Sequence, residues 1–166
     1  RTLYWLLSPL LPEARQNVMD ELLAWAGSVP ILRPNHRIVN LEEVSALGKG
    51  GLIEIGAHSV THPFLSFLPT ARQREEIQES KTRLEEIIGQ PVVSFAYPHG
   101  NYSEETTALV REAGFTSACT TYPRTLRRWR WARNSGGSDR FKLPRVVVED
   151  WDGEEFAKQL SEWRAS

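Results

Sequence analysis

Two histidines four residues apart are the first feature of the sequence that could do chemistry. They lie in the segment His58-Ser59-Val60-Thr61-His62-Pro63, and the chain has only four histidines in all. Side chains at positions i and i+4 of one helical turn face the same side, with Cβ atoms about 5–6 Å apart. Two imidazoles at that spacing can bind one divalent ion and leave room for a carboxylate and a water. The spacing therefore favours a metal site at His58 and His62, with two ordinary polar loop residues as the competing interpretation.

A second cluster of interest is the segment 95–100, which reads Phe-Ala-Tyr-Pro-His-Gly. Pro98 restricts the turn, and Gly100 allows the backbone to approach a ligand closely. The amides that follow Pro98 can then face a ligand. An ordinary strand-to-helix turn would explain the same residues. Because this turn and the histidine pair both follow predicted strands, we expect them at the same edge of a parallel sheet.

The elements that must position these residues alternate along the chain. Helices are predicted over residues 12–26, 40–48, 70–88, 103–113 and 152–163, and strands over residues 52–56, 92–97, 115–121 and 143–148. Asn40 with Glu43, and Thr70 with Gln73, form capping-box patterns at two helix starts. Short strands alternating with helices predict βαβ units and a parallel sheet, either doubly wound or barrel-like.

Composition limits both the size of the fold and its ligands. The chain has 166 residues, 40% of them hydrophobic, which fits a single domain with a packed core. Lys and Arg total 20 against 21 Asp and Glu, so a globally basic nucleic-acid binder is excluded. The single Cys119 permits neither an internal disulfide nor a cysteine zinc cluster, so a metal site must use histidines and carboxylates. No apolar run approaches the ~20 residues that cross a bilayer, and no membrane partner is expected.

Two further features concern the ends and the linkers of the chain. It begins at Arg1 without a Met or a signal-peptide pattern, so we expect a domain that is incomplete at its N-terminus, and no compartment is indicated. The segment Tyr122–Lys142 holds seven Lys or Arg residues and one acid, with Trp129 and Trp131 among them. We expect a basic, mobile loop within the domain. An Arg- and Trp-rich nucleic-acid-binding module is the alternative, since aromatic rings among arginines can stack on bases.

The ordered combination of motifs resembles a known family. The segment His58–Pro63 is similar to the H-[ST]-x-x-H-P motif of polysaccharide deacetylases, the NodB-homology domain of carbohydrate esterase family four. The segment 95–100, followed by Gly114-Phe115 and Ala118, resembles that family's R-x-P-Y-G region and the stretch after it. Leu143-Pro144-Arg145 is similar to a motif near the family's C-terminus. The resemblance implies an α/β fold, an incomplete (β/α)-barrel-like domain over residues 1–166 with parallel strands alternating with helices.

The resemblance also implies a function. It points to a metal-dependent hydrolase that removes N-acetyl or O-acetyl groups from a carbohydrate or polysaccharide, cleaving a C–N bond other than a peptide bond in the amide case. His58 and His62 would hold Zn²⁺, or Co, Ni or Mn in its place. His99 would be catalytic, through its backbone N–H at the oxyanion or its imidazole as an acid. The expected partner is an acetylated glycan and not a nucleic acid. This glycan would contact Tyr97, Pro98 and Gly100.

The chain departs from the family pattern at several positions. The family's first strand carries an Asp-Asp pair, one residue as catalytic base and one as third metal ligand. No Asp-Asp pair occurs here, where the aspartates are Asp20, Asp139, Asp150 and Asp152. Ala96 stands at the usual Arg, His99 stands at the usual Tyr, and no histidine follows as a late general acid. The chain is then either part of a longer deacetylase or an inactive domain of the same fold, and Asp150 and Asp152 are the first places to look for a base.

Overall fold

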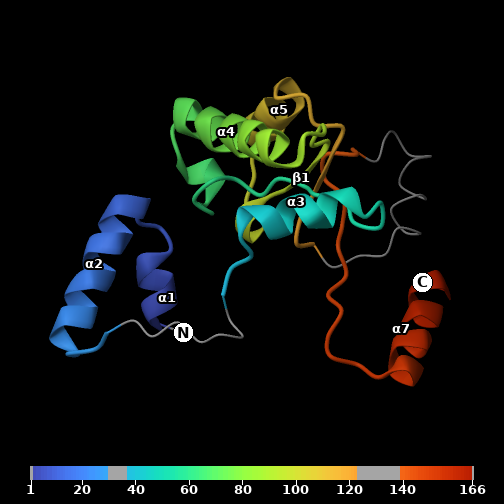
Figure 1. Ribbon diagram of the computed structural model, residues 1–166, viewed down its shortest axis with the longest axis horizontal. Helices are drawn as coiled ribbons and strands as arrows, with labels where there is room; N and C mark the ends of the chain where they lie inside the picture. Colours follow the sequence, from blue (N-terminus) through green and yellow to red (C-terminus); the bar gives the residue numbers. More distant parts are fainter. Residues whose placement is uncertain (1, 30–36, 123–138, 166) are drawn as a thin grey trace.

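The computed structural model describes residues 2–29, 37–122 and 139–165 (Figure 1). Its α-helices are α1 (Thr2–Leu7), α2 (Pro12–Trp25), α3 (Leu41–Lys49), α4 (Thr70–Ile88), α5 (Glu104–Glu112) and α7 (Gly153–Ala165). Short 3₁₀ turns are η2 (Leu65–Phe67) and η3 (Pro98–Gly100), and the strands are β1 (Ser94–Ala96) and β2 (Ser117–Cys119). The five predicted helices are therefore confirmed, with ends that differ by one or two residues.

The sheet is parallel, as predicted. In β1 and β2, Ser94 lies opposite Ser117 and Ala96 lies opposite Cys119, and α5 forms the crossover between the two strands. Single parallel bridges extend the pairing outward, from Ala57 to Phe95 on one side and from Cys119 to Leu143 on the other. Four chain segments thus run side by side in sequence order, and the carboxyl ends of all four meet at one edge.

The predicted strands at 52–56 and 143–148 are wrong as full strands. Each outer segment contributes one bridge residue, Ala57 or Leu143, and the rest has no strand assignment. Leu52 is 97% exposed and Val147 is 72% exposed. An extended segment becomes a ladder only where a neighbour supplies hydrogen-bond partners along its length. In the described part of the chain, the backbone hydrogen bonds to a neighbouring segment occur at Ala57 on one side and at Leu143 and Arg145 on the other, which is too few for a continuous ladder.

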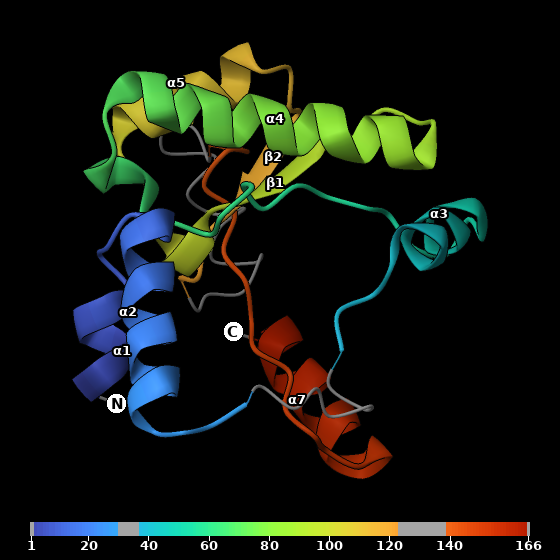
Figure 2. The same cartoon turned by 60° about the vertical axis from the view of Figure 1, so that its left-hand side comes forward.

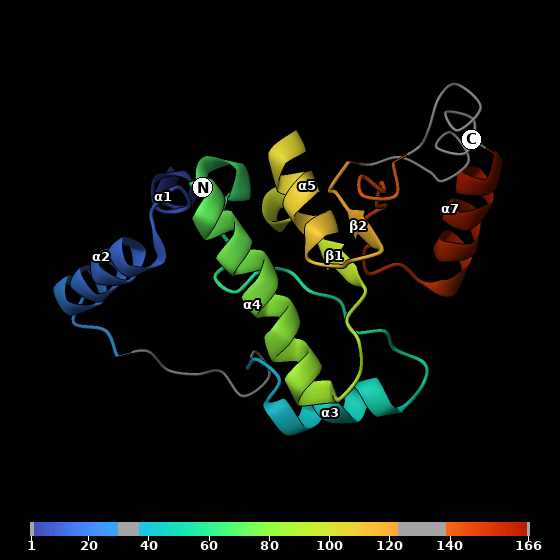
Figure 3. The same ribbon diagram turned by 90° about the horizontal axis from the view of Figure 1, so that it is seen from above.

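Two helices cover one face of the sheet and form the core with it. Figure 1 and Figure 3 show α4 and α5 side by side over β1 and β2. The buried residues include Leu65, Ile77, Val92, Phe95, Tyr97, Val110 and Phe115. Between the helices, the hydroxyl of Thr106 donates to Gln73 Oε1 at 2.7 Å, so this buried polar pair is satisfied.

The helix starts test the two capping-box predictions. In α3, the side chain of Asn40 accepts from the Glu43 N–H while Glu43 accepts from the Asn40 N–H, as predicted. The box at Thr70 is wrong, because Pro69 is the N-cap of α4. Gln73 reaches back to the Leu68 carbonyl at 2.9 Å. A proline in the extended conformation already sets the direction of the chain into this helix, so the Thr70 side chain bonds Glu105 instead.

The terminal helices lie apart from this core. Figure 2 shows α1 and α2 packed side by side and α7 separate from α4 and α5. The helix α2 reaches the rest of the fold through Arg15, whose Nη2 donates to the Thr61 carbonyl at 3.2 Å. Among the described residues, no helix combines the length and apolar character that crossing a membrane requires.

Most of the predicted basic loop, residues 123–138, lies outside the described residues. Its last residues are described and are packed against the fold. Phe141 is buried, Asp139 pairs with Arg111, and Lys142 pairs with Glu104 at 2.5 Å. The prediction of mobility is therefore wrong for residues 139–142, and for residues 123–138 it lies outside the described part of the chain.

Candidate metal site at the histidine cluster

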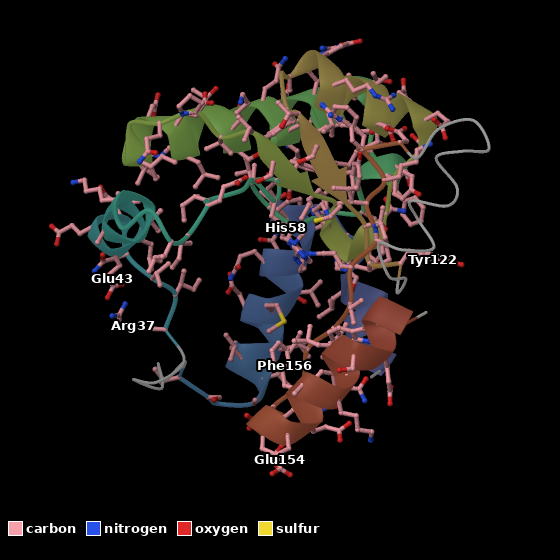
Figure 4. All side chains as sticks on the ribbon, turned by 90° about the vertical axis from the view of Figure 1, so that its right-hand side faces the viewer. Arg37, Glu43, His58, Tyr122, Glu154 and Phe156 are labelled. Carbon is pink, nitrogen blue, oxygen red and sulfur yellow. The ribbon has the colours of Figure 1, made fainter. Side chains whose placement is uncertain are left out.

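Three histidines from two loops meet at the carboxyl edge of the sheet. The ring centroids of His58 and His62 are 4.8 Å apart, and those of His62 and His99 are 4.3 Å apart, each pair edge to face. His58 follows the bridge residue Ala57, and His99 lies in η3 just after β1. In Figure 4, His58 lies beneath the ends of the strands. The expectation that His58 and His99 share one edge is confirmed.

The orientation of the His58 ring suits a metal ligand. Its Nδ1 lies 2.7 Å from the Ala96 carbonyl oxygen. A carbonyl can only accept, so Nδ1 carries a proton, and in the neutral imidazole Nε2 then presents its lone pair. Metal-binding histidines usually donate their other N–H to a carbonyl or carboxylate in this way. The ring also lines an open cavity of about 800 Å³, together with Gly56, Glu79 and Arg83, so a ligand can reach it.

The second histidine is held with its ring toward the first. The His62 N–H donates to Ser59 Oγ at 3.0 Å, which closes the short turn between the two residues. Partial burial, and then the nearby His99 and His58, lower the pKa of His62 below its ordinary value. A lowered pKa keeps this imidazole neutral at neutral pH, which is the form that binds a metal.

Backbone strain is concentrated in this site. Among the described residues, the non-glycine residues with left-handed φ are Ser59 (63°), His62 (57°) and His99 (57°). Such conformations cost about 1–3 kcal/mol each and persist only where surrounding contacts enforce them. All three belong to the histidine cluster or to the turn that forms it. The fold therefore stabilises an otherwise unfavourable backbone at the place where the imidazoles converge.

Glu76 of α4 is a residue of the site that sequence reasoning missed. Its carboxylate is buried, with 5% of the residue exposed. It accepts hydrogen bonds from the N–H groups of Val60 and Thr61 and from the Thr61 hydroxyl. A signal was available, because Glu76 falls on the same helical stripe as Gln73, Ile77 and Ser80, all of which are buried. An acid on the apolar face of a helix needs buried partners.

The imidazole of His99 is close to the pair but turned toward the backbone. Its Nε2 lies 3.3 Å from the His62 carbonyl oxygen. The ring of Phe64 is stacked on its face, with centroids 4.0 Å apart. The Nε2 of His99 therefore faces a peptide carbonyl. In His58 the nitrogen that faces a carbonyl is Nδ1, and Nε2 points away from that carbonyl.

The three predicted substrate contacts take different places. Tyr97 and Pro98 are fully buried, so their side chains pack in the core. The Tyr97 hydroxyl donates to the Phe141 carbonyl at 3.0 Å, and burial raises the pKa of Tyr97 to about 12. The alternation of side chains along β1 continues through Phe95 and Tyr97, which both point to the helices.

Gly100 is required by close packing. Its φ is +67°, and a Cβ there would lie 2.0 Å from Thr121 Oγ1. The glycine therefore allows η3 to pass directly against the chain after β2. This contact is the close backbone approach that the sequence predicts, but its partner is the protein itself.

A catalytic base is not evident among the described residues. Within them, no group of three or more His, Cys, Asp or Glu side chains could hold a metal ion. The Asp152 carboxylate accepts from the N–H groups of Glu154 and Glu155, so it caps α7. The Nε–H of Arg145 donates to the Thr120 carbonyl at 2.7 Å, so this nitrogen binds the backbone. Among the described residues, His58 and His62 are two imidazoles that could bind a divalent ion, and they would make only part of a complete ligand set.

Several solved structures share this fold. BC0361, a polysaccharide deacetylase from Bacillus cereus, matches 76% of the chain with 23% identity and a TM-score of 0.62. The Streptococcus pyogenes deacetylase PplD, solved in complex with acetate, matches 75% with 20% identity and a TM-score of 0.61. A mutant of BA3943, a family-four pseudoenzyme, matches 76% with 18% identity and a TM-score of 0.50. The chain spans only 38%, 52% and 48% of these three proteins.

The family itself is identified by sequence. No curated protein sequence matches the chain. The polysaccharide deacetylase family model matches residues 31–118, which is just over half of the chain and includes all three histidines of the cluster. The parallel sheet, the histidine turn at its carboxyl edge and the shared fold agree with that match. The chain therefore belongs to the polysaccharide deacetylase family and carries part of its NodB-homology domain.

Proposed function

We propose that this domain binds a divalent metal ion through His58 and His62 and serves in the removal of acetyl groups from a glycan. The observation that carries the proposal is the orientation of His58. Its Nδ1–H is committed to the Ala96 carbonyl, and its Nε2 is available within 4.8 Å, ring to ring, of a second imidazole. A histidine whose Nδ1–H is held by a carbonyl, beside a second imidazole, is typical of the ligands of Zn²⁺ and similar ions.

Each residue has a limited task in this proposal. His58 and His62 hold the ion, which when bound polarises a carbonyl and lowers the pKa of a bound water. The backbone N–H of His99 helps to bind the oxyanion, a type of donor worth roughly 2.7–4 kcal/mol. The left-handed φ of His99 turns the peptide at this point of η3. The substrate class, an acetylated carbohydrate, is inferred from membership of the family.

An inactive domain of the same fold is the second candidate. The observation in its favour is that no acidic side chain joins the histidines as a third ligand in the described part of the chain. A base contributes typically ~10²–10⁴-fold to such a reaction. We therefore expect acetate release by these 166 residues alone to be near background. Activity of a longer protein would need the missing acids from another part of its sequence.

Metal binding and acetate release together test the proposal. Calorimetry with Zn²⁺ is expected to show binding to the chain and at least a tenfold loss of affinity in His62→Ala. Equal binding by both proteins would contradict the metal site. Acetate release from acetylated chito-oligosaccharides is then measured with and without a chelator. Chelator-sensitive release supports the deacetylase, and Zn²⁺ binding without any release supports the inactive domain.

A further inference from the structure

We propose that Glu76 is a positioning residue for the metal site. Its buried carboxylate holds the turn from Ser59 to His62 in the conformation that brings His58 and His62 together. This inference rests on the proposed function for the role of the two histidines. The contacts of Glu76 with the turn do not depend on that function.

The carboxylate is fully engaged by the turn. One oxygen, Oε2, accepts from the N–H groups of Val60 and Thr61 at 2.8 and 2.9 Å. The other, Oε1, accepts from the Thr61 hydroxyl at 2.6 Å. Hydrogen bonds to a charged acceptor are roughly twice as strong as neutral ones. A buried acid with both oxygens on one short turn is therefore a strong anchor for it.

The position of these contacts within the turn gives them their effect. Val60 and Thr61 lie between Ser59 and His62, the two residues of this turn with left-handed φ. The unusual backbone at either end directs two successive N–H groups toward the same oxygen. Strained conformations persist only when other contacts enforce them, and the carboxylate supplies three such contacts in addition to the bond from the His62 N–H to Ser59 Oγ. His62 is the last of these strained residues, so the position of its ring depends on the conformation of the turn.

Thr61 is held from the opposite side as well. Its carbonyl accepts from Arg15 Nη2 of α2 at 3.2 Å. Its N–H and hydroxyl bond Glu76 of α4, so all three of its polar groups are engaged. The peptide before His62 is thereby fixed between two helices. Of these contacts, the two with the Glu76 carboxylate are made by a buried acidic group.

The test compares variants that remove hydrogen-bond acceptors or donors of this turn with one that removes a neighbouring carboxylate. Glu76→Met keeps the length of the side chain and removes both acceptors. Glu75→Met is the matched control, since Glu75 is the preceding residue of α4, is exposed, and forms an ion pair with Arg72. Glu76→Gln keeps one carbonyl oxygen for the two backbone N–H groups and removes the charge. Thr61→Val removes the hydroxyl bond alone.

Two measurements distinguish a role in positioning the histidines from a contribution to the stability of the whole fold. The first is NMR of the metal-free proteins, which follows the imidazole signals of His58 and His62 and the exchange of the Val60 and Thr61 amides. The second is titration with Zn²⁺. In Glu76→Met we expect at least a tenfold faster exchange of both amides and shifted imidazole signals, while amides of α5 exchange as in the unmodified protein. We expect Zn²⁺ affinity to fall at least fivefold, with no loss in Glu75→Met.

The outcomes test the positioning role of Glu76 and the proposed metal site separately. Unchanged imidazole signals and amide exchange in Glu76→Met would overturn the positioning role, whatever the metal does. If Zn²⁺ fails to bind the unmodified chain, the proposed function is wrong, and the NMR result still decides the role of Glu76. If Glu76→Met does not fold, the decision passes to Glu76→Gln and Thr61→Val. Smaller changes at the same amides and imidazoles in those variants support the role, and spectra identical to the unmodified protein refute it.

Discussion

The ring of Phe64 lies flat against the imidazole of His99, with centroids 4.0 Å apart and planes inclined by 10°. The two residues come from different loops, one just after the His62 turn and one in η3 after β1. The stack and the 3.3 Å contact of His99 Nε2 with the His62 carbonyl tie these loops together. The orientation of the third histidine is therefore decided by its packing against the loop that carries the other two.

Replacing Phe64 should release the His99 ring. We expect Phe64→Leu to lower the free energy of unfolding by about 1–2 kcal/mol, because an aromatic pair is worth ~0.5–1.5 kcal/mol beyond its buried area. The His99 ring protons should shift downfield as the ring current of Phe64 is lost. Phe67→Leu is the comparison, since Phe67 also stacks on Phe64, with centroids 5.5 Å apart, but is 69% exposed, and the variant keeps the Phe64 ring that stacks on His99. It should therefore lose less than about 1 kcal/mol and leave the His99 signals in place. Denaturant unfolding and proton NMR measure both effects, and equal losses in the two variants would contradict the prediction.

The imidazole of His99 should not be a metal ligand. His99→Phe keeps a flat ring against Phe64 and removes both nitrogens. Because Nε2 faces the His62 carbonyl, we expect Zn²⁺ affinity to stay within about twofold, in contrast to the tenfold or greater loss expected for His58→Ala. Calorimetry of the variants checks this. A loss in His99→Phe as large as that in His58→Ala would make His99 the third ligand.

Gly100 should tolerate no side chain. In Gly100→Ala, the new Cβ would lie 2.0 Å from Thr121 Oγ1, in addition to the cost of a left-handed φ. We expect a loss of more than about 3 kcal/mol in the free energy of unfolding. Gly89→Ala is a matched control, because Gly89 has the same φ of +67° and nothing within 4 Å of the new Cβ. It should lose only about 1 kcal/mol. Similar losses at both positions would show that φ alone matters.

The buried hydroxyl of Tyr97 should make the fold sensitive to alkali. Burial raises its pKa to about 12, above the ordinary value of 10, so the neutral form is favoured in the folded state. The unfolded chain loses this proton near pH 10 while the folded chain keeps it, and stability falls as the pH rises from 10 to 12. The contribution is roughly 2 kcal/mol at the upper end of that range.

Tyr97→Phe isolates this contribution from that of the other tyrosines. The variant loses about 1–2 kcal/mol at neutral pH, because the Phe141 carbonyl loses its donor. Its stability should then decline less steeply than that of the unmodified protein between pH 10 and 12. Urea unfolding across this range measures the slopes. Parallel declines would show that Tyr97 ionises as readily in the fold as in the unfolded chain.

The sequence by itself determined five of the described α-helices, all except α1, and the location of the site. The spacing of apolar residues and the caps, such as Asn40 with Glu43 and the left-handed Gly89 at the end of α4, are local, so they act the same way in any fold. The His58–His62 spacing likewise located the histidine cluster, although the segment forms an irregular turn with left-handed residues and not the helical turn on which that prediction is based. These features depend on residues within a few positions of one another, and a linear pattern contains them.

Only the tertiary structure decided which groups face the site. Tyr97 and His99 are two residues apart in the same motif, yet one is buried against Phe141 and the other stacks on Phe64. Glu76 reaches the histidine turn across 15 residues of chain, and the outer strands shrink to single bridges for want of neighbours. Each of these outcomes depends on what lies across the fold from a residue. A buried carboxylate, a strand edge or a ring face is satisfied by whichever partner packing brings to it, and no local pattern specifies that partner.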